Sequence, residues 1–399
     1  MHLHLSFSQF SRRLVLATAA LSLAGTIHAP DVSAQTKISC PLKIGSVRPE
    51  SGAGASFGQS LARGVEMGVQ EVNSKGGIAG CQVQIVSYDS QSLPANAATL
   101  TNRLINQDRV SLVLGSSIST ETLAMMEITE NASFPLYVPS AASARITNQG
   151  AKWVWRQSVI DLSAARLFAE FIAKDLGYKK LGAIYENTDY GRVPVQEVLK
   201  SELEKHGSKL VIAEAFNIGD PDISSQLLRV RDAGADGIVY WGHEKEGALL
   251  VRQNIQLGIN LPIAGNTGIV YPAFLDLLPA DAQAKTNLVA VTQFVWTNKD
   301  PAQAEWKNKF KARYNRDPDV TSMDGYDAIF VIKSAIEAVG STEPEALKKA
   351  FSAVRFKGVG GSIAFDSTGQ AVRSLLIVRL TPKTGPGFEV VKVVQPGQY

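Results

Sequence analysis

Short apolar runs alternate with amphipathic stretches over the first part of the chain. In the stretch 57–73, Leu61, Val65 and Val69 recur at helical spacing and form one apolar stripe. The pattern predicts strands at 43–47, 82–88, 110–114 and 136–138, and helices at 57–73, 94–107 and 120–130. Strands that alternate with helices form right-handed βαβ units, so we expect a parallel sheet with helices on both faces.

A second series of the same kind begins near residue 163. Its predicted helices are 163–176, 193–206, 222–233 and 244–257, and its predicted strands are 180–185, 210–216, 237–240 and 261–264. Two successive series predict two α/β lobes. Ligands of open α/β folds bind beyond the carboxyl ends of the strands, and there Phe57 and Tyr190 each stand at the start of a helix.

The C-terminal part of the chain is mixed. It predicts helices at 302–314, 327–339 and 343–352, and strands at 361–365, 374–380 and 388–394. No proline- or serine-rich linker separates the two series, so we expect the chain to pass between the lobes more than once and to leave a cleft between them. We predict one lobe from residues 35–157 plus 293–358 and the other from 158–292 plus 359–399.

The segment 1–34 does not share this alternation. Arg12 and Arg13 precede an apolar run that ends at Gly25, and Ala34 closes a small-residue motif of the kind that signal peptidases cut. The run is too short to span a bilayer, which takes about 20 residues. We therefore predict a signal peptide, used by either the general secretory or the twin-arginine route, and a mature chain that begins at Gln35.

Composition narrows the classes of function. The 399 residues include 40 Lys+Arg and 37 Asp+Glu, a formal net charge of +3, and 45% are hydrophobic. Nucleic-acid-binding chains show a basic excess and disordered chains show low hydrophobicity, so neither class fits. Beyond the signal peptide the only histidines are His206, in a polar helical stretch, and His243. A histidine-dependent hydrolase or a multi-histidine metal site is therefore not expected.

Cys40 and Cys81 are the only cysteines, and each stands just before a predicted strand. If those strands are parallel neighbours, the two cysteines lie side by side, and an oxidising compartment favours a disulfide. Closing a loop of about 40 residues is worth roughly 3 to 4 kcal/mol in the chain-entropy model. Two free buried thiols are the alternative, and two cysteines alone cannot build a structural zinc site.

The glycine-rich loop 51–58 follows a strand and opens a helix, which is the setting of a dinucleotide-binding loop. Phe57 stands where that fingerprint needs its third glycine, and the chain has no phosphate-binding loop that ends in Gly-Lys-Ser/Thr. The sequence therefore supports neither kind of nucleotide site. We expect no cofactor, no metal and no catalytic residues.

A polar loop with Ser117 and Ser119 follows the strand 110–114 and opens the next helix. Free backbone N–H groups and the helix dipole favour an anion at such a point, so a carboxylate is a candidate ligand. Simple capping of the helix by Ser119 is the alternative. The small residues of the loop 139–143, after the next strand, either leave room for a ligand or form a turn.

Several short motifs follow one another in the order seen in periplasmic solute-binding proteins of the leucine/isoleucine/valine-binding type. They are Phe57-Gly58, the run 72–80 (VNSKGGIAG), Gly115 followed by Ser119, Pro139-Ser140-Ala141, Tyr190-Gly191 and Gly325-Tyr326-Asp327-Ala328. The chain resembles this family from about residue 43 to its end. The resemblance implies a two-lobed type I periplasmic-binding fold, each lobe a parallel sheet flanked by helices, with three crossovers between them. It further implies a periplasmic monomer that captures a solute by lobe closure and delivers it to an ABC permease.

The resemblance also assigns roles in the first lobe. Ser119 corresponds to the serine that binds the ligand carboxylate, and Ser117 lies in the same loop. Ser140, Ala141 and Ala142 occupy the loop that contacts the carboxylate and the ammonium group. Ala142 stands where a threonine hydroxyl usually helps to hold the amino-acid backbone, which is a departure from the family pattern.

In the cleft, the resemblance places aromatic residues on both sides. Phe57 and Tyr190 match aromatic residues that close on the ligand, and His243 stands where an aromatic residue is frequent. Thr267 is a second departure, because amino-acid binders have there a glutamate that holds the ammonium group.

These departures leave the ligand open, because a buried ammonium group without an anionic partner is costly. Asp324 or Glu244 is a candidate source of the missing charge. Otherwise the ligand is a carboxylate without an amine, such as an aromatic or keto acid, or a short amide or urea. The same fold also serves as a sensory module of receptors and regulators, which is the alternative to transport.

Overall fold

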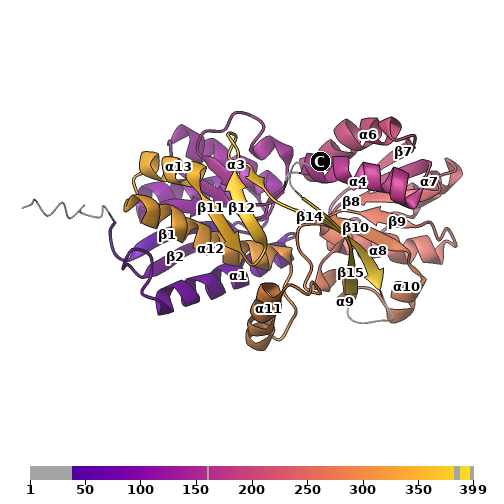
Figure 1. Ribbon diagram of the computed structural model, residues 1–399. Coiled ribbons are helices and arrows are strands. Elements are labelled where there is room, and N and C mark those ends of the chain that lie inside the picture. The colour runs from indigo at the N-terminus through magenta and orange to yellow at the C-terminus, as the bar shows by residue number, and fades with distance from the viewer. Residues whose placement is uncertain (1–37, 160, 382–386, 396–399) are drawn as a thin grey trace, which may run out of the picture. The chain divides into compact units, whose positions relative to one another are not determined.

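The computed structural model of the chain describes residues 38–159, 161–381 and 387–395. These residues belong to the compact unit Thr36–Tyr399, which Figure 1 shows as a ribbon. The predicted signal peptide, residues 1–34, lies outside the described residues. Its cleavage site therefore stays a prediction.

The first lobe contains a five-stranded parallel sheet in the order β2-β1-β3-β4-β5. Its strands are β1 (Leu42–Arg48), β2 (Val83–Asp89), β3 (Leu112–Leu114), β4 (Leu136–Val138) and β5 (Val154–Arg156). The helices between them are α1 (Ala55–Ser74), α2 (Pro94–Arg103), which a π-helical turn extends to Asp108, and α3 (Ser119–Asn131). The predicted alternation is confirmed. The short strand β5 was not predicted, because three residues show no period.

Side chains of the first sheet alternate between two apolar cores. On β3, Leu112 and Leu114 pack into one core with α1. Val113 between them points into the opposite core, which includes residues of α2 and α3. Both faces of the sheet are buried, as expected for a parallel sheet covered by helices.

The second lobe contains a seven-stranded sheet in the order β15-β14-β10-β9-β8-β6-β7. Its strands are β6 (Lys180–Glu186), β7 (Lys209–Phe216), β8 (Gly237–Trp241), β9 (Ile263–Gly265), β10 (Leu288–Thr292), β14 (Leu375–Thr381) and β15 (Gly387–Val394). Its helices are α4 (Asp161–Phe171), α5 (Asp189–Val193), α6 (Lys200–Lys205), α7 (Ser224–Asp232), α8 (Glu244–Gln256), α9 (Pro272–Asp276) and α10 (Ala280–Lys285). β6 to β10 pair in parallel, and β14 and β15 add an antiparallel edge.

The remaining elements return to the first lobe before the last two strands. They are α11 (Pro301–Tyr314), α12 (Val320–Val339), α13 (Pro344–Ala353), β11 (Arg355–Gly358), β12 (Gly361–Phe365) and β13 (Ala371–Val372). Within the described residues, the chain thus crosses between the lobes after β5, after β10 and after β13, which confirms the three predicted crossovers. Because Ile363 and Phe365 of β12 pack in the core of the first sheet, we propose to draw the last crossing after β13. The predicted lobe boundaries otherwise stay a prediction.

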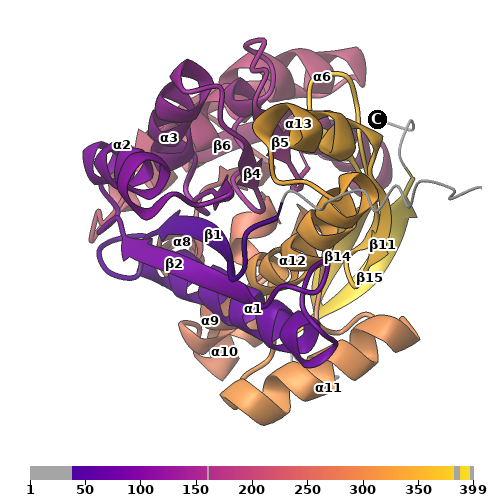
Figure 2. The same ribbon diagram turned by 90° about the vertical axis from the view of Figure 1, so that its left-hand side faces the viewer.

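Helix α12 begins at Val320, seven residues before Asp327, where the sequence predicts its start. The side chain of Asp319 accepts from the backbone N–H of Ser322, and Ser322 Oγ contacts the Asp319 backbone in return, which forms a capping box. α12 lies beside α1 in Figure 2. A Cβ atom at Gly64 of α1 would stand 1.9 Å from the Ser322 carbonyl oxygen, so only glycine permits this close approach.

The predicted disulfide is confirmed. β1 and β2 are parallel neighbours with Leu42 opposite Val83, so the residues that precede them meet at one end of the sheet. Cys40 and Cys81 are bonded, with their Cα atoms 5.1 Å apart. The bond joins the segments that lead into β1 and β2.

Candidate ligand-binding cleft

A cavity of about 80 Å³ lies between the two lobes. Loops that follow β3 and β4 line it from the first lobe, loops that follow β6, β8 and β9 line it from the second, and the crossing segments after β5 and β10 close it. These positions are carboxyl ends of parallel strands, where open α/β sheets bind ligands. All predicted ligand-binding residues line this cavity except Ala141 and Asp324.

The wall from the first lobe is built around the start of α3. The preceding residue, Ile118, provides no side-chain cap, so the first-turn N–H groups are left for another acceptor. Ser119 Oγ accepts from the backbone N–H of Ser143 at 3.2 Å, and its own hydroxyl hydrogen is free to donate. Ser117 Oγ is buried and has no hydrogen-bond partner among the described residues. This wall is suited to an anion.

Glu121, in the first turn of the same helix, does not line the cavity. It is completely buried, and its Oε2 accepts from Ser116 Oγ at 2.5 Å. Burial raises the pKa of Glu121, although hydrogen bonds oppose the shift. The carboxyl group is thus turned away from the anion position and keeps its charge out of the cavity.

The loop after β4 contributes Ser140 and Ala142 to the cavity wall. Ala141, between them, is 1% exposed and packs into the apolar core of the first lobe instead. On the other side, Thr267 lines the cavity while its Oγ1 donates to the Val291 carbonyl at 3.2 Å. None of these side chains provides an anionic group.

The wall from the second lobe is aromatic. The His243 ring stacks on Tyr190 with ring centroids 4.7 Å apart and meets the edge of Phe57 at 4.6 Å. Phe57 in turn packs against Tyr271 at 5.1 Å. Phe57 belongs to the first lobe and the other three to the second, so this cluster closes one side of the cavity across the cleft. Tyr271 was not predicted, because no local motif marks it.

His243 forms an ion pair with a residue that the sequence analysis missed. Its Nδ1 lies 2.5 Å from Oε2 of Glu186, at the end of β6. Burial alone lowers the pKa of His243, but the charge and hydrogen bond of Glu186 outweigh burial and raise it to about 9. Burial raises the pKa of Glu186 and His243 lowers it, with a net decrease. The two residues therefore neutralise each other inside the cavity wall.

Asp161, at the start of α4, is a second acid of the cavity that the sequence analysis missed. It is 7% exposed, and its Oδ2 has no hydrogen-bond partner among the described residues. Burial raises the pKa of Asp161 well above its ordinary value, although the charges of Arg156 and His243 and the nearby Trp241 indole act in the opposite direction. No local sequence motif marks an acid that follows a crossing segment, so the sequence analysis did not identify Asp161.

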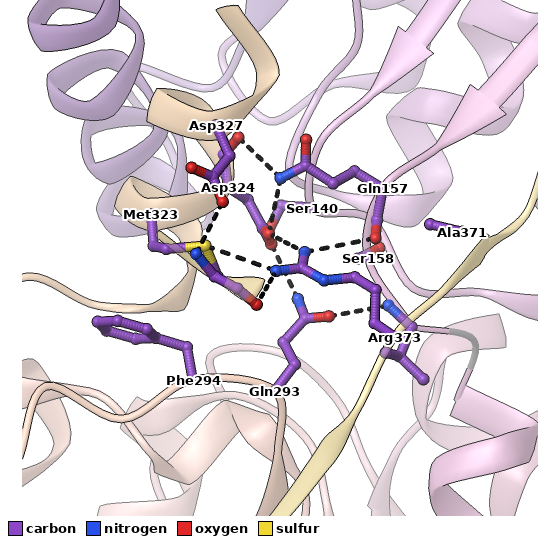
Figure 3. A network of polar contacts seen from close by, with 12 residues as sticks. Ser140, Gln157, Ser158, Gln293, Phe294, Met323, Asp324, Asp327, Ala371 and Arg373 are labelled. Atoms are coloured by element: carbon purple, nitrogen blue, oxygen red, sulfur yellow. Dashed lines mark hydrogen bonds and ion pairs between the residues drawn. The ribbon is translucent and has the colours of Figure 1, made fainter. Parts of the chain in front are cut away.

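Asp324 does not reach the cavity, because its carboxylate holds the three crossing segments together. Its Oδ1 accepts from Gln157 at 3.0 Å and from Arg373 at 2.9 Å, and its Oδ2 accepts from Gln293 at 2.9 Å. Figure 3 shows these side chains converging on it. Gln157 follows β5, Gln293 follows β10, and Arg373 follows β13. Asp324 thus connects the three crossing segments, which are called the hinge below.

Glu244 also stands apart from the cavity lining. Its Oε1 accepts from Ser56 Oγ of the other lobe at 2.7 Å. Ser56 is the serine of the run Gly54-Ala55-Ser56-Phe57-Gly58, which has the Gly-x-Ser-x-Gly spacing of hydrolase nucleophile elbows. Ser56 lies inside helix α1, and its hydroxyl donates to the Glu244 carboxylate of α8 and not to the histidine base that a serine nucleophile needs.

Comparison with known proteins identifies the family. The model of the periplasmic binding protein family matches residues 41–386. A leucine-, isoleucine-, valine-, threonine- and alanine-binding protein of Pseudomonas aeruginosa is 28% identical over 360 residues, which are 90% of this chain and 93% of that protein. Within the described residues, no helix combines the length and the apolar character needed to cross a membrane.

Solved structures share the fold over nearly their whole length. The branched-chain amino-acid transporter substrate-binding protein LivJ of Streptococcus pneumoniae, in complex with isoleucine, superposes with a TM-score of 0.78 at 26% identity, covering 88% of this chain and 99% of that chain. An ABC-transporter solute-binding protein of Rhodopseudomonas palustris, in complex with 3,4-dihydroxybenzoic acid, gives 0.82 at 20% identity, covering 89% and 97%. The second likeness concerns the fold alone. The chain described here therefore belongs to the periplasmic binding protein family, in its branched-chain-amino-acid type of ABC substrate-binding proteins.

Proposed function

We propose that this chain captures a small carboxylate-bearing solute in its interlobe cleft, in the periplasm, and delivers it to the membrane subunits of an ABC permease. The proposal includes removal of residues 1–34 during export and no catalytic turnover of the solute. The observation that carries it is the start of α3, where Ser117 and Ser119 line the cavity, Ser117 Oγ has no partner among the described residues, and the first turn has no side-chain cap. The permease partner and the periplasmic location follow from the family.

The carboxylate assignment has a physical basis in the charges around the cavity. Glu121 is directed away from the anion position, and Glu186 is neutralised by His243. Asp161 also lines the cavity, but from the start of α4. At the start of α3, the helix dipole and the backbone donors favour a negative group. The family relationship agrees, since the relatives named above are described with amino acids or an aromatic acid.

A thermal-shift screen of refolded, ligand-free protein tests the proposal. The panel contains amino acids, keto acids, aromatic acids, short amides and urea. A ligand at 100 times its dissociation constant stabilises the protein by about 2.7 kcal/mol. We expect the largest shifts from compounds with a carboxylate. Larger shifts from amides or urea, or steady turnover of the bound compound, would contradict the proposal.

Ser119→Ala tests the site itself. Losing one hydrogen bond to a charged group costs about 1.5 to 3 kcal/mol, so the affinity for the best carboxylate should fall about 10- to 100-fold by calorimetry. Thr129→Val is the matched control, because Thr129 is a buried hydroxyl on the same helix that donates to the Met126 carbonyl. The control should leave affinity unchanged. Equal affinities of the wild type and Ser119→Ala would remove the carboxylate assignment.

A further inference from the structure

The starts of two helices from different lobes meet beside the cavity. Ser56 and Phe57 lie in the first turn of α1, in the first lobe, and His243 and Glu244 stand at the start of α8, in the second lobe. Phe57 meets the edge of the His243 ring at 4.6 Å, and Ser56 Oγ donates to Glu244 Oε1 at 2.7 Å. The aromatic pair lines the cavity, whereas Ser56 and Glu244 do not. A polar contact between the lobes thus accompanies the aromatic contact without lining the cavity.

Glu244 depends on the other lobe for a side-chain donor. It is 2% exposed, and its Oε2 has no hydrogen-bond partner among the described residues. Burial raises the pKa of Glu244, although the charge of His243, the Ser56 hydroxyl, the backbone N–H of Glu244 and the charge of Lys245 act in the opposite direction. Removing the donor of a buried charged group leaves that group unsatisfied, which costs more than an ordinary hydrogen bond contributes.

The start of α1 has no acid of its own. Its N-cap residue, Gly54, provides no side-chain cap, and its first turn contains no acidic residue. Negative charge near the first turn of a helix is stabilising. The Glu244 carboxylate is therefore complementary to two helix starts, that of its own helix α8 and, from the other lobe, that of α1. Separation of the lobes would remove both the bond from Ser56 and the attraction to α1.

Other polar contacts between the lobes are less suited to keep them together. Arg145 of the first lobe pairs with Asp189 of the second at 2.5 Å, but the Arg145 side chain is 50% exposed, and exposed ion pairs contribute little. The Tyr271 hydroxyl lies 2.7 Å from Thr321 Oγ1, but both residues line the cavity and are open to a solute. The contact between α1 and α8 is buried at its acid and separate from the cavity.

We propose that the hydrogen bond from Ser56 to Glu244 holds the two lobes closed, so that it determines how tightly and for how long a solute is retained without touching the solute. This inference rests on the proposed capture of a solute and extends it. The apparent dissociation constant rises as the binding-competent form becomes less populated. Loss of the bond should therefore weaken different solutes by the same factor. It should act mainly on the dissociation rate, where most differences in affinity between related complexes arise.

Ser56→Ala removes the donor and leaves the buried carboxylate in place. The probes are L-leucine, L-phenylalanine, pyruvate and benzoate, with affinities from isothermal titration calorimetry and dissociation rates from stopped-flow tryptophan fluorescence. For each probe that the wild type binds, the dissociation constant should rise about 10- to 100-fold, and the dissociation rate should rise by a similar factor. Unchanged values, or a loss confined to one chemical class of probe, would overturn the proposal.

Two further variants control for the substitution itself. Ser74→Ala is the matched control, because Ser74 is a serine at the other end of α1 that donates within its own helix, to the Glu71 carbonyl at 2.8 Å. It should leave affinity and dissociation rate unchanged. Ser56→Thr keeps a hydroxyl and should stay within about 3-fold of the wild-type affinity.

Urea denaturation separates retention of the solute from folding. Without ligand, Ser56→Ala and the wild type should have the same free energy of unfolding, because the bond acts on the closed arrangement of the lobes. A loss of ligand-free stability equal to the loss of binding free energy would assign the contact to folding and overturn the proposal.

A double-mutant cycle tests whether the two residues act through one contact. Glu244→Gln removes the charge and keeps an oxygen acceptor, so it should weaken binding less than Ser56→Ala does. The double variant Ser56→Ala/Glu244→Gln should lose no more affinity than Ser56→Ala alone. If the losses of the two single variants multiply in the double variant, the residues act independently and the proposal is wrong.

Ser119→Ala distinguishes this inference from the proposed function, since all four probes carry a carboxylate. If Ser119→Ala weakens binding and Ser56→Ala does not, the carboxylate site stands and the role of the interlobe contact is refuted. If Ser56→Ala weakens binding and Ser119→Ala does not, the carboxylate site fails and the interlobe contact stands. If the wild type binds none of the four probes, both fail together.

Discussion

The cavity and the hinge each contain a buried acid, and the two acids differ in how the protein satisfies them. Asp324, at the hinge, is 0% exposed and accepts hydrogen bonds from Gln157, Gln293 and Arg373. Asp161, in the cavity, is 7% exposed and keeps an oxygen without a partner among the described residues. Burial raises the pKa of both, that of Asp324 to about 6.

A buried acid with hydrogen-bond donors and one without them affect the stability of the fold differently. A carboxylate surrounded by donors from all three crossing segments contributes to the folded arrangement of the lobes. A buried carboxylate that faces the cavity without such donors costs stability, so folding alone does not explain its presence. The following experiments test this contrast, from the largest expected effect to the smallest.

Arg373→Met should have the largest effect on stability. Arg373 is 1% exposed, pairs with Asp324 at 2.9 Å and donates to the Gly360 carbonyl at 2.7 Å. Removing the guanidinium leaves a buried carboxylate uncompensated, so the free energy of unfolding should decrease by about 3 to 5 kcal/mol. Urea denaturation of the ligand-free protein measures it. A loss below about 1 kcal/mol would mean that the hinge ion pair does not hold the crossing segments.

Asp324→Asn and Asp161→Asn should affect stability differently. Asp324→Asn removes the charged partner of Arg373 and should cost about 2 to 3 kcal/mol. Asp161→Asn removes a poorly satisfied buried acid, so the ligand-free protein should be as stable as the wild type or slightly more stable. Parallel urea denaturation curves of the two ligand-free variants measure this difference in stability. If both variants lose the same stability, the contrast between the two acids is wrong.

The His243–Glu186 pair lies between these two cases, because both residues line the cavity and each compensates the charge of the other. The pKa of His243 is raised from 6.5 to about 9 in the folded protein. Its contribution to stability is therefore fully present below pH 6.5 and is lost as the pH rises through about 9. The loss should be on the order of 3 kcal/mol. Stability curves of the wild type and His243→Phe at pH 6 to 10 measure it, and an equal slope in both would contradict the assignment.

Arg145→Ala should have the smallest effect. Arg145 follows β4 and pairs with Asp189 of α5 at 2.5 Å, and its side chain is 50% exposed. Exposed ion pairs contribute about 0 to 1 kcal/mol and weaken with salt. Denaturation at low and at high salt should differ little between the variant and the wild type. A change above about 2 kcal/mol would show that exposure does not separate weak charge pairs from strong ones in this protein.

Much of the fold could be predicted from the sequence. The βαβ alternation determines the order of the helices and the strands, because apolar residues repeat with the period of each element. It also placed Cys40 and Cys81 beside each other before parallel neighbours β1 and β2. The strands β5, β10, β11 and β13, the helices α9 and α10, and the first turns of α12 escaped prediction. Most of these elements have only two to six residues, too few to show a period, and all five residues of β10 are buried, so it shows no apolar–polar alternation. The turns around Ser322 and Gly325 form because they pack against α1.

The candidate site was predicted in part. Motif positions such as Phe57, Ser119 and Tyr190 follow strand ends, and strand ends of parallel sheets meet at one edge, so the structure brings these residues to one cavity. Their roles in binding stay predictions. Glu186 and Tyr271 are cavity residues of the second lobe that carry no local motif, and only the approach of the lobes brings them into the cleft.

The two acids show what the sequence alone determines and what the tertiary structure decides. Local apolar periodicity and short motifs specify the elements and the loops that end at the cleft, because those signals act between residues close in the chain. Asp161 and Asp324 look alike in sequence, and neither is distinguished by its neighbours. Their roles depend on donors from distant segments: Gln157, Gln293 and Arg373 reach Asp324 from three crossings, and none of these donates to Asp161 Oδ2. Satisfaction of a buried charge is a property of the folded chain, so only the tertiary structure decides it.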